Sequence, residues 1–355
     1  MAVVRYQGDL PIWYGKRGLH DPGMERFDSG EVLIPVPLLL SRGLLNTAGH
    51  SEIFNLVAIV ILSRGKCGLS NCTTRYLVAM AAADLLLVIT NVILYRIIYY
   101  YFPTSFLNIT PVSCVILTVS HIAGECSVWF TIMFSFDRFV AICCPKLKTK
   151  YCTEKTAAVV LGTTSMLFCL KNVPFYFTLG PGETIDNVPF FCFFKPNLYT
   201  EPGWMVYDRF SMVLTPLLPF ALILLVNALT VRHIFVASRV RKGLRGQSKG
   251  ENCSDPEMAS RQKSVILLFA ISGNFILLWL TYVICILYYT IQTVNPDDND
   301  STKIIRQVGI MLANLCCCTN TLLYGVSQSK FREQFKNTVK YPITSLIQII
   351  KKQNN

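Results

Sequence analysis

The chain consists mainly of long apolar runs separated by short polar segments. A bilayer core about 30 Å thick requires roughly 20 mostly apolar residues for each spanning helix. Windows of that size predict an all-α membrane protein, a seven-transmembrane helix bundle with a short amphipathic eighth helix. The expected spans are 36–62, 74–101, 113–143, 156–179, 205–236, 263–291 and 304–327, followed by an amphipathic stretch at 329–340.

One membrane domain uses nearly the whole chain. We expect an extracellular N-terminal segment at 1–35, a transmembrane domain at 36–328, and a cytoplasmic eighth helix and tail at 329–355. The first window is irregular, because Arg42, His50 and Glu52 interrupt it. Its clean part, Ile53 to Leu62, rises only about 15 Å, half a bilayer. Either the helix buries these charges inward, or residues before about 52 are a replaced or wrongly assembled segment.

The composition agrees with a lipid environment, since 52% of the residues are hydrophobic and 15% are charged. The net charge of +12 would suit nucleic acid if it formed a single patch. Instead, the basic residues cluster in alternate loops, represented by Arg64, Lys148 and Arg241. Cytoplasmic loops carry such an excess of Lys and Arg. We therefore expect a plasma-membrane protein with its N-terminus outside and its C-terminus inside, in contact with membrane lipids and without a nucleic-acid partner.

Most of the 14 cysteines lie within the windows or on the cytoplasmic side, where thiols stay reduced. Cys114 lies at the outer end of the third window and Cys192 in the second outer loop. Because both face an oxidising space, we expect a disulfide between them. The outward-facing sequons make Asn108 and Asn299 candidate glycosylation sites, with Pro111 close behind Asn108 weighing against the first.

Ionisable residues inside the predicted spans are costly, so each suggests a functional role. Asp84 lies among apolar residues of the second window, where a bare carboxylate would be costly. It therefore needs partners inside the bundle. Asp137 and Arg138 place an acid beside a base at the cytoplasmic end of the third window.

These motifs resemble those of rhodopsin-like (class A) G-protein-coupled receptors over about residues 53–340. The run Asp137-Arg138-Phe139 is similar to the Asp-Arg-Tyr signature of that family, and the run from Asn320 to Tyr324 is similar to its Asn-Pro-x-x-Tyr motif. Further residues sit where the pattern expects them: Asn55, Asp84, Pro219 and Trp279.

The resemblance implies a receptor, not an enzyme, that transmits an extracellular small-molecule or peptide signal to a heterotrimeric G protein. It places Asp137, Arg138, Asn320 and Tyr324 at the coupling end, where the acid holds the arginine at rest. Many relatives add a second acid at the base of the sixth helix, where this chain has Arg261. We therefore expect elevated basal activity.

Within this family, several short motifs of the chain are similar to those of the orphan group around probable G-protein-coupled receptor 139. That group is linked to aromatic amino acids and small peptides as ligands. The similarity rests on Ala81-Ala82-Ala83-Asp84, on Asp137 to Cys143, and on Pro219 with Asn227 eight residues further on.

A cluster that binds sodium in many relatives is matched by Asp84, Ser127, Asn55 and Asn320. Oxygen ligands suit such a hard cation. A hydrogen-bonded cluster without an ion is the open alternative, because cysteines replace polar groups often found nearby. No cofactor is expected, and a sodium ion would act as an allosteric ligand if the cluster holds one.

The outer halves of the helices offer a set of polar and aromatic residues for a ligand: Arg96, His121, Glu125, Arg209, Trp279 and Tyr282. Together they could hold a zwitterion, with an arginine on its carboxylate, Glu125 on its ammonium and the aromatic pair as a floor. Each residue also has a structural interpretation. Arg96 would extend to the interface, Glu125 would pair with His121, Trp279 would be core, and Arg209 would pair with Asp208.

Two prolines of the family pattern are missing, since Thr281 and Thr321 replace them in the sixth and seventh helices. These losses and the irregular first window motivate an alternative function, a receptor-like membrane protein that no longer signals. A transporter or membrane enzyme is disfavoured, because the sequence shows no inverted repeat, zinc motif or nucleotide loop.

Overall fold

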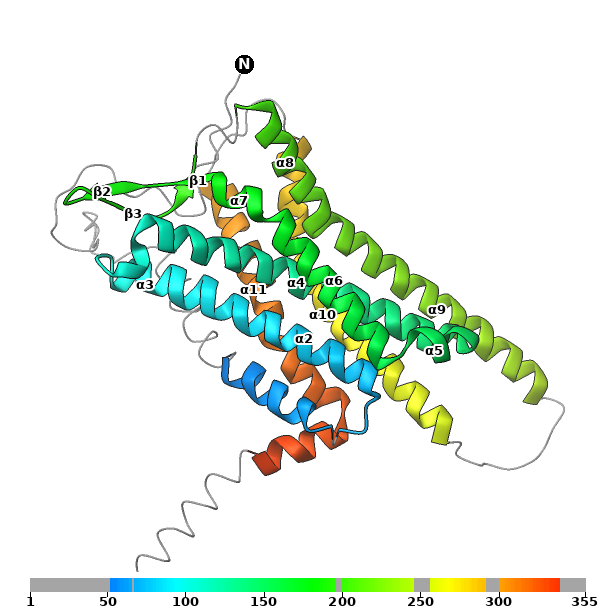
Figure 1. The fold of residues 1–355 in the computed structure, drawn as a ribbon. Coiled ribbons are helices and arrows are strands. Elements are labelled where there is room, and N and C mark those ends of the chain that lie inside the picture. Colours follow the sequence, from blue (N-terminus) through cyan, green and yellow to red (C-terminus); the bar gives the residue numbers. More distant parts are fainter. Residues whose placement is uncertain (1–51, 66, 196–199, 246–255, 292–299, 339–355) are drawn as a thin grey trace, which may run out of the picture.

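The computed structural model describes residues 52–65, 67–195, 200–245, 256–291 and 300–338, whose helices form one elongated bundle (Figure 1). Within these residues, six helical segments are long and apolar enough to cross a membrane: Asn71–Ile97, Thr110–Cys143, Glu154–Phe177, Pro202–Arg239, Ser264–Tyr288 and Val308–Ser327. A shorter apolar helix, Glu52–Ser63, supplies the described part of the first span. The predicted seven-helix fold is confirmed, while the interrupted part of the first window lies outside the described residues.

The spans are built from helices with the following bounds. The second contains α2 (Asn71–Leu87), the π-helical η1 (Val88–Ile97) and α3 (Ile98–Tyr101), and the third is α4 (Thr110–Cys143). After α5 (Pro145–Tyr151), the fourth contains α6 (Glu154–Lys171) and α7 (Val173–Phe177). The fifth contains α8 (Pro202–Met212), the π-helical η4 (Val213–Leu217) and α9 (Leu218–Arg245), and the last two are α10 (Pro256–Ile291) and α11 (Asp300–Ser327).

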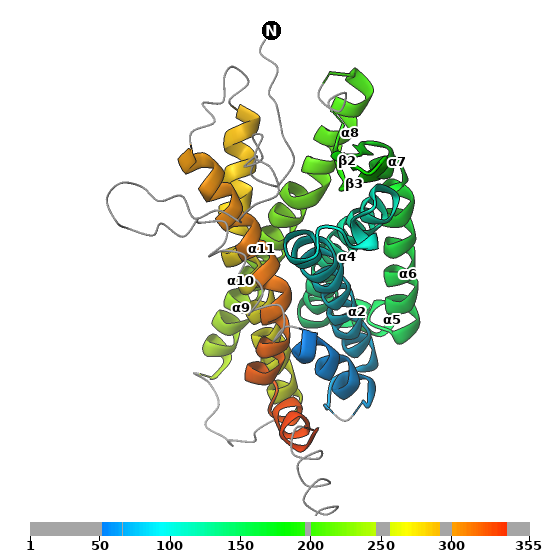
Figure 2. The same cartoon turned by 90° about the vertical axis from the view of Figure 1, so that its left-hand side faces the viewer.

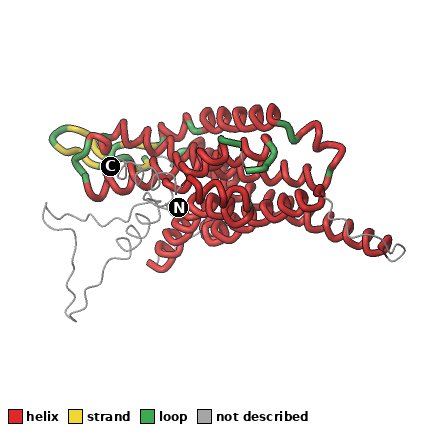
Figure 3. Tube along the Cα trace, turned by 90° about the horizontal axis from the view of Figure 1, so that it is seen from below, coloured by secondary structure: helices red, strands yellow, loops and turns green. Residues whose placement is uncertain are grey.

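Helix α4 lies in the middle of the bundle. It contacts α2, α6, α9 and α10, and Figure 2 shows α6 at one edge with α9, α10 and α11 on the opposite side. Viewed from below, the helices run along one long axis and the strands gather at one end (Figure 3). We call this the hairpin end, and we call the opposite end, which carries α5, the α5 end (Figure 1).

Several helices begin before the predicted windows, because polar first turns precede their apolar parts. The Ser70 hydroxyl caps α2 by accepting from the Thr73 amide at 3.3 Å, and Thr153 caps α6 by accepting from the Thr156 amide at 3.2 Å. Such caps satisfy amides that the helix itself leaves free. Pro111 lies in the first turn of α4, where its missing N–H costs nothing.

The loop after α7 forms two small antiparallel pairs that the sequence did not predict. Strand β2 (Glu183–Ile185) pairs with β3 (Val188–Phe190), and β1 (Leu179–Gly180) pairs with β4 (Phe193–Phe194). Between β2 and β3, Asp186 and Asn187 have φ of 49° and 62°, as the favoured two-residue hairpin turn requires. The predicted Cys114–Cys192 disulfide is present, with 5.3 Å between its Cα atoms, and ties this loop to α4.

The largest buried cluster lies nearer the α5 end and joins α2, α4, α10 and α11. Leu77, Phe134, Leu267 and Tyr324 belong to it, and each is almost fully shielded from solvent. Phe331 adds a ring from the helix at 329–338, which falls within the amphipathic stretch expected at 329–340. This packing fixes α2, α4 and α11 relative to one another, and these helices carry the polar groups described next.

Candidate functional site

An acid–base pair lies in the last turns of α4, at the α5 end of the bundle. The Arg138 guanidinium donates to Oδ2 of Asp137 through Nε at 3.0 Å and also through a terminal nitrogen. Both side chains are about 6% exposed, so the pair is buried. A buried charge stays ionised only when it is paired and hydrogen-bonded. Asp137 and Arg138 are thus held together, as the sequence motif predicts.

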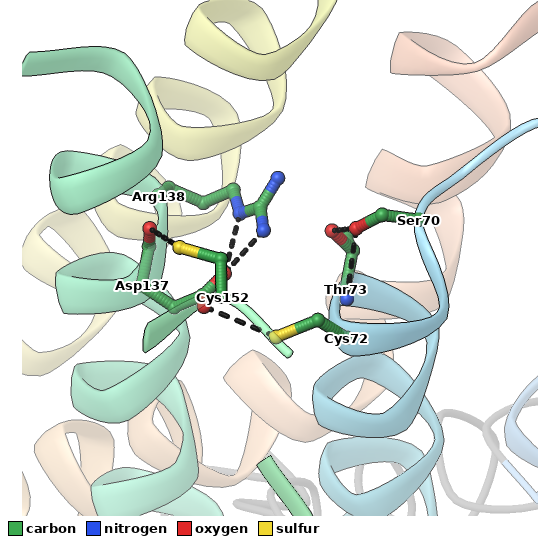
Figure 4. Close-up of polar contacts among 6 residues, drawn as sticks. All are labelled: Ser70, Cys72, Thr73, Asp137, Arg138 and Cys152. Carbon is green, nitrogen blue, oxygen red and sulfur yellow. Dashed lines mark hydrogen bonds and ion pairs between the residues drawn. The ribbon is translucent and has the colours of Figure 1, made fainter. Parts of the chain in front are cut away.

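Two cysteines complete the surroundings of Asp137 (Figure 4). Cys72, which α2 presents to α4, donates its thiol to Oδ1 of Asp137 at 3.1 Å. Cys152, between α5 and α6, donates to the Asp137 main-chain carbonyl at 3.5 Å. Burial first, and then the charge of Asp137, raise the pKa of the Cys152 thiol to about 12. Arginine and thiol therefore divide the two carboxylate oxygens between them.

The other predicted coupling residues lie deeper in the bundle. Tyr324 is 1% exposed and packs edge-on against Phe331, with 6.1 Å between ring centroids. Asn320 belongs to the polar cluster around Asp84. The side chain of Arg261, where relatives carry a second acid, lies outside the described residues, so the basal-activity expectation stays a prediction.

Asp84 is fully buried and has the partners that its position requires. Ser127 of α4 donates to Oδ1, and Asn320 of α11 donates through Nδ2 to Oδ2 at 2.9 Å. The carboxylate thereby joins α2, α4 and α11 in the middle of the bundle. A charge-assisted hydrogen bond is roughly twice as strong as a neutral one, so this cluster is a strong restraint.

The fourth predicted member, Asn55, bonds mainly to α11. Its Nδ2 donates to the Cys317 carbonyl at 3.1 Å, and its Oδ1 accepts from the Thr321 hydroxyl at 2.8 Å. Thr321 is the residue that replaces the proline of the family pattern. The substitution restores a main-chain N–H and adds a hydroxyl that ties the first helix to the seventh.

The oxygen atoms around Asp84 are of the kind that bind a hard cation. Its carboxylate and the Ser127 hydroxyl supply oxygen ligands, which such ions prefer. Oδ1 of Asn320 is buried and has no hydrogen-bond partner among the described residues, so one acceptor there is uncommitted. A buried acceptor without a partner is costly, and an ion or a water would relieve that cost.

The residues predicted for ligand binding form separate groups nearer the hairpin end. Arg96 donates to Oδ1 of Asn91 at 3.2 Å, and Asn91 donates to the Ser120 hydroxyl at 3.0 Å. These two hydrogen bonds link the second span to α4. The His121 ring lies 4.1 Å from that of Phe175, measured between centroids.

The two aromatic residues predicted for the ligand site, Trp279 and Tyr282, are in contact with each other. Trp279 stacks on Phe275 with 5.2 Å between centroids and meets Tyr282 edge-on at 5.8 Å. Arg209 is exposed on α8, so the structure does not bring it together with the other members of the set. Arg96 contacts Asn91 within the second span, and Trp279 contacts Tyr282 within α10, so a joint zwitterion site stays a prediction.

Glu125 faces the fourth span. Its carboxylate pairs with the Lys171 ammonium and accepts from Nδ2 of Asn172 at 2.5 Å. Lys171 lies 5.7 Å from the centroid of the Tyr207 ring, and its carbonyl accepts from the Tyr207 hydroxyl at 3.2 Å. Glu125 is 6% exposed and so serves a buried contact among three spans. The ammonium partner expected from a ligand is already supplied by the protein.

Asn108 does not fit its expected role as a glycosylation site. It is 2% exposed, and its Nδ2 donates to the carbonyls of Phe102 and Pro103 at 2.9 and 3.0 Å. A glycan attached to this nitrogen would have no space, and it would replace one of the two N–H donors that make these bonds. We correct the expectation accordingly, because the side chain closes a turn. The other candidate, Asn299, lies outside the described residues.

Lys171, Asn172 and Cys72 were not singled out from the sequence. The signal for Lys171 was available, because it is an ionisable residue inside the fourth apolar window. Cys72 carried no such signal, since a cysteine at a helix start usually behaves as a small apolar residue. Its contact with Asp137 depends on how α2 packs on α4.

Comparison with known proteins agrees with this arrangement of helices and motifs. The family model for the 7 transmembrane receptor (rhodopsin family) matches residues 54–324. The chain therefore belongs to the rhodopsin family of seven-transmembrane receptors, which are receptors and not enzymes.

Similar proteins include an opsin and two further receptors. The compound eye opsin BCRH2 of Hemigrapsus sanguineus is 26% identical over 293 residues, 80% of this chain and 74% of the opsin. Cysteinyl leukotriene receptor 1 of Sus scrofa is 22% identical over 79% of this chain and 78% of that receptor. The FMRFamide receptor of Drosophila melanogaster is 24% identical over 82% of this chain and 52% of its own length.

Proposed function

We propose that the protein is a plasma-membrane receptor that transmits an extracellular small-molecule or peptide signal to a heterotrimeric G protein. The hairpin end faces outward, because it carries the disulfide, and the α5 end faces the cytoplasm, because the basic loops lie there. Family membership supports the general role. The ligand and the coupling are our inference.

The buried Asp137–Arg138 pair is the observation that carries the proposal. The guanidinium is held within α4 by a neighbouring acid, so it can be released if a second helix packing is stabilised. A ligand shifts such an equilibrium only by its differential affinity for the two packings. Arg138 then becomes available to a partner at the α5 end.

The proposal is tested by ligand-free nucleotide exchange on a panel of G proteins, with surface arrival confirmed by an outward-facing tag. Asp137→Asn removes the charge that holds Arg138, so exchange should rise above that of the wild type. Arg138→Ala should abolish it. Arg75→Ala is the matched control, because Arg75 is an exposed basic residue paired with Glu154 at the same end.

The alternative function, a receptor-like protein that no longer signals, predicts a different outcome. It would be favoured if the wild type and Asp137→Asn both reached the surface and neither activated any G protein. Rising exchange with Asp137→Asn and none with Arg138→Ala would exclude it.

For the ligand, we propose an aromatic amino acid, in line with the orphan group around probable G-protein-coupled receptor 139. Arg96 supplies a cation for the carboxylate, and Trp279 with Tyr282 supplies aromatic faces. A screen should compare each aromatic amino acid with its amide, which lacks the carboxylate. Equal responses to acid and amide would contradict a role for Arg96.

The position of Arg261 gives a second, independent expectation. An acid at this position would add a partner for Arg138, and this chain has none in its sequence there. Ligand-free exchange should therefore be higher in the wild type than in Arg261→Glu. Equal exchange at equal surface level would count against the missing-acid argument.

A further inference from the structure

Within the six described membrane spans, every acidic side chain except Asp208 is bonded to another residue of the protein. The bonded acids are Asp84, Glu125, Asp137 and Glu154. Among the described residues, Asp208 has no hydrogen bond and no ion pair, and the local pair with Arg209 that the sequence allowed is not formed. An ionisable residue inside a membrane span is costly unless it is paired, so an uncommitted carboxylate there indicates a partner from outside the chain.

Asp208 lies on the side of the fifth span that is turned away from lipid. Val206 and Phe210 mark the lipid side of α8, since they are 69% and 53% exposed. Trp204 and Asp208 lie on another face, because side chains four positions apart share a helix face, and both are only partly exposed. The hydroxyl of the adjacent Tyr207 donates to a main-chain carbonyl of the fourth span at 3.2 Å. This side of α8 therefore faces the bundle.

An aromatic ring lies one helical turn before the carboxylate, on the same face. Trp204 meets the Tyr207 ring edge-on, with 6.2 Å between centroids, and its indole stays partly exposed. A carboxylate accepts strong hydrogen bonds from an ammonium, and tryptophan offers the most favourable aromatic face to a cation. The Lys171 ammonium is already paired with Glu125, so it does not neutralise Asp208.

We propose that Asp208 and Trp204 bind the ammonium group of an extracellular ligand, with the apolar body of the ligand against the indole. The inference rests on the proposed function, because it names the charge class of the ligand and the residues that hold its cationic end. Glu125 was the acid expected to accept an ammonium, and Asp208 takes that role. Helix α8 lies at the hairpin end (Figure 1), and Asp208 is about 9 Å along the helix from its first residue, Pro202.

The test measures ligand binding to the full chain in phosphatidylcholine nanodiscs, without a G protein, from the shift in melting temperature. The probes are tryptamine and phenethylamine, and N-acetyltryptamine is the matched neutral analogue. Tryptamine should raise the melting temperature saturably, and N-acetyltryptamine should need about a tenfold to hundredfold higher concentration, because it lacks the hydrogen bond between charged groups. Equal potency of the two, or no saturable shift with either amine, would overturn the proposal.

Charge variants separate recognition of the ammonium from a structural role of Asp208. Asp208→Asn should remove the preference for tryptamine, whereas Asp208→Glu should retain most of it. Arg209→Gln should strengthen tryptamine binding about two- to threefold, because a nearby exposed positive charge is removed. Glu183→Gln is the matched control, since Glu183 is an exposed acid on the hairpin at the same end.

Equal tryptamine binding by the wild type and Asp208→Asn would overturn the proposal. A structural role alone would change the melting temperature without ligand and would leave the preference for the amine intact. Because no G protein is present, a receptor that binds amines and never signals would contradict only the proposed function. A receptor that signals and ignores amines would contradict only this inference.

Discussion

At the scale of single residues, the Glu125–Lys171 pair is the contact whose loss should be most damaging. The side chains are 7% and 13% exposed, so removal of one partner leaves a charge buried without compensation. Lys171→Met should therefore lower the free energy of unfolding by roughly 3–5 kcal/mol. The double variant Lys171→Met with Glu125→Gln should regain part of this loss, measured by thermal unfolding of the purified receptor.

The matched control for these Lys171 and Glu125 variants is the Arg75–Glu154 pair, whose side chains are 58% and 42% exposed. Arg75→Met should hardly change the melting temperature, because exposed pairs are screened by solvent. If Lys171→Met were as mild as Arg75→Met, the buried contact would not contribute to stability as argued.

The Cys152 thiol should react slowly with maleimides. With its pKa raised to about 12 by burial and by Asp137, its thiolate fraction at neutral pH falls roughly a thousandfold below that of an ordinary cysteine. Its alkylation rate should keep rising with pH beyond 9, where an ordinary thiol levels off. Peptide-level mass spectrometry can compare it with a new cysteine in a Lys146→Cys variant, and a plateau shared by both would contradict the shift.

The sequence identified the buried charged residues more successfully than it identified their bonding partners. Asp84 and Asp137 were recognised as costly buried acids, and both have the bonds that this cost requires. Glu125 was recognised too, but its Lys171 partner comes from another span. A partner distant in sequence depends on how the helices rotate and pack, which local spacing does not determine.

At the scale of elements, hydropathy located every described span but not its ends. The sixth window was placed at 263–291 and α10 begins at Pro256, because a polar turn extends the helix beyond the apolar part. The fourth window, 156–179, is interrupted at Asn172, where α6 ends and α7 begins. The π-helical η1 had no sequence signal, because it depends on packing of the second span.

The link between the first and seventh helices gives a prediction at this scale. Thr321→Val keeps the shape of the side chain but removes the hydroxyl that donates to Asn55. Unfolding free energy should fall by about 1–2 kcal/mol, because a buried hydrogen bond is lost. Thr163→Val is the control, since its hydroxyl bonds within α6 at an exposed position. Equal melting temperatures for both variants would contradict the interhelical role.

For the whole molecule, α4 connects every part of the site. Along this one helix lie the disulfide at the hairpin end, the Glu125 contact with the fourth span, the Ser127 contact with Asp84, and the Asp137–Arg138 pair. A change in the packing of α4 against its neighbours therefore alters these contacts together. We infer that this arrangement couples the two ends of the bundle.

The polar cluster around Asp84 offers a direct test of that coupling. In this packing the Asp84 cluster is assembled while Arg138 is held by Asp137. We therefore propose that an ion bound to the cluster stabilises the state in which Arg138 is held. Replacing sodium with N-methylglucamine at constant ionic strength should therefore raise ligand-free nucleotide exchange. Asp84→Asn should remove this response, because the neutral amide loses the charge that attracts the cation. Exchange that is insensitive to sodium in the wild type would instead favour the hydrogen-bonded cluster without an ion.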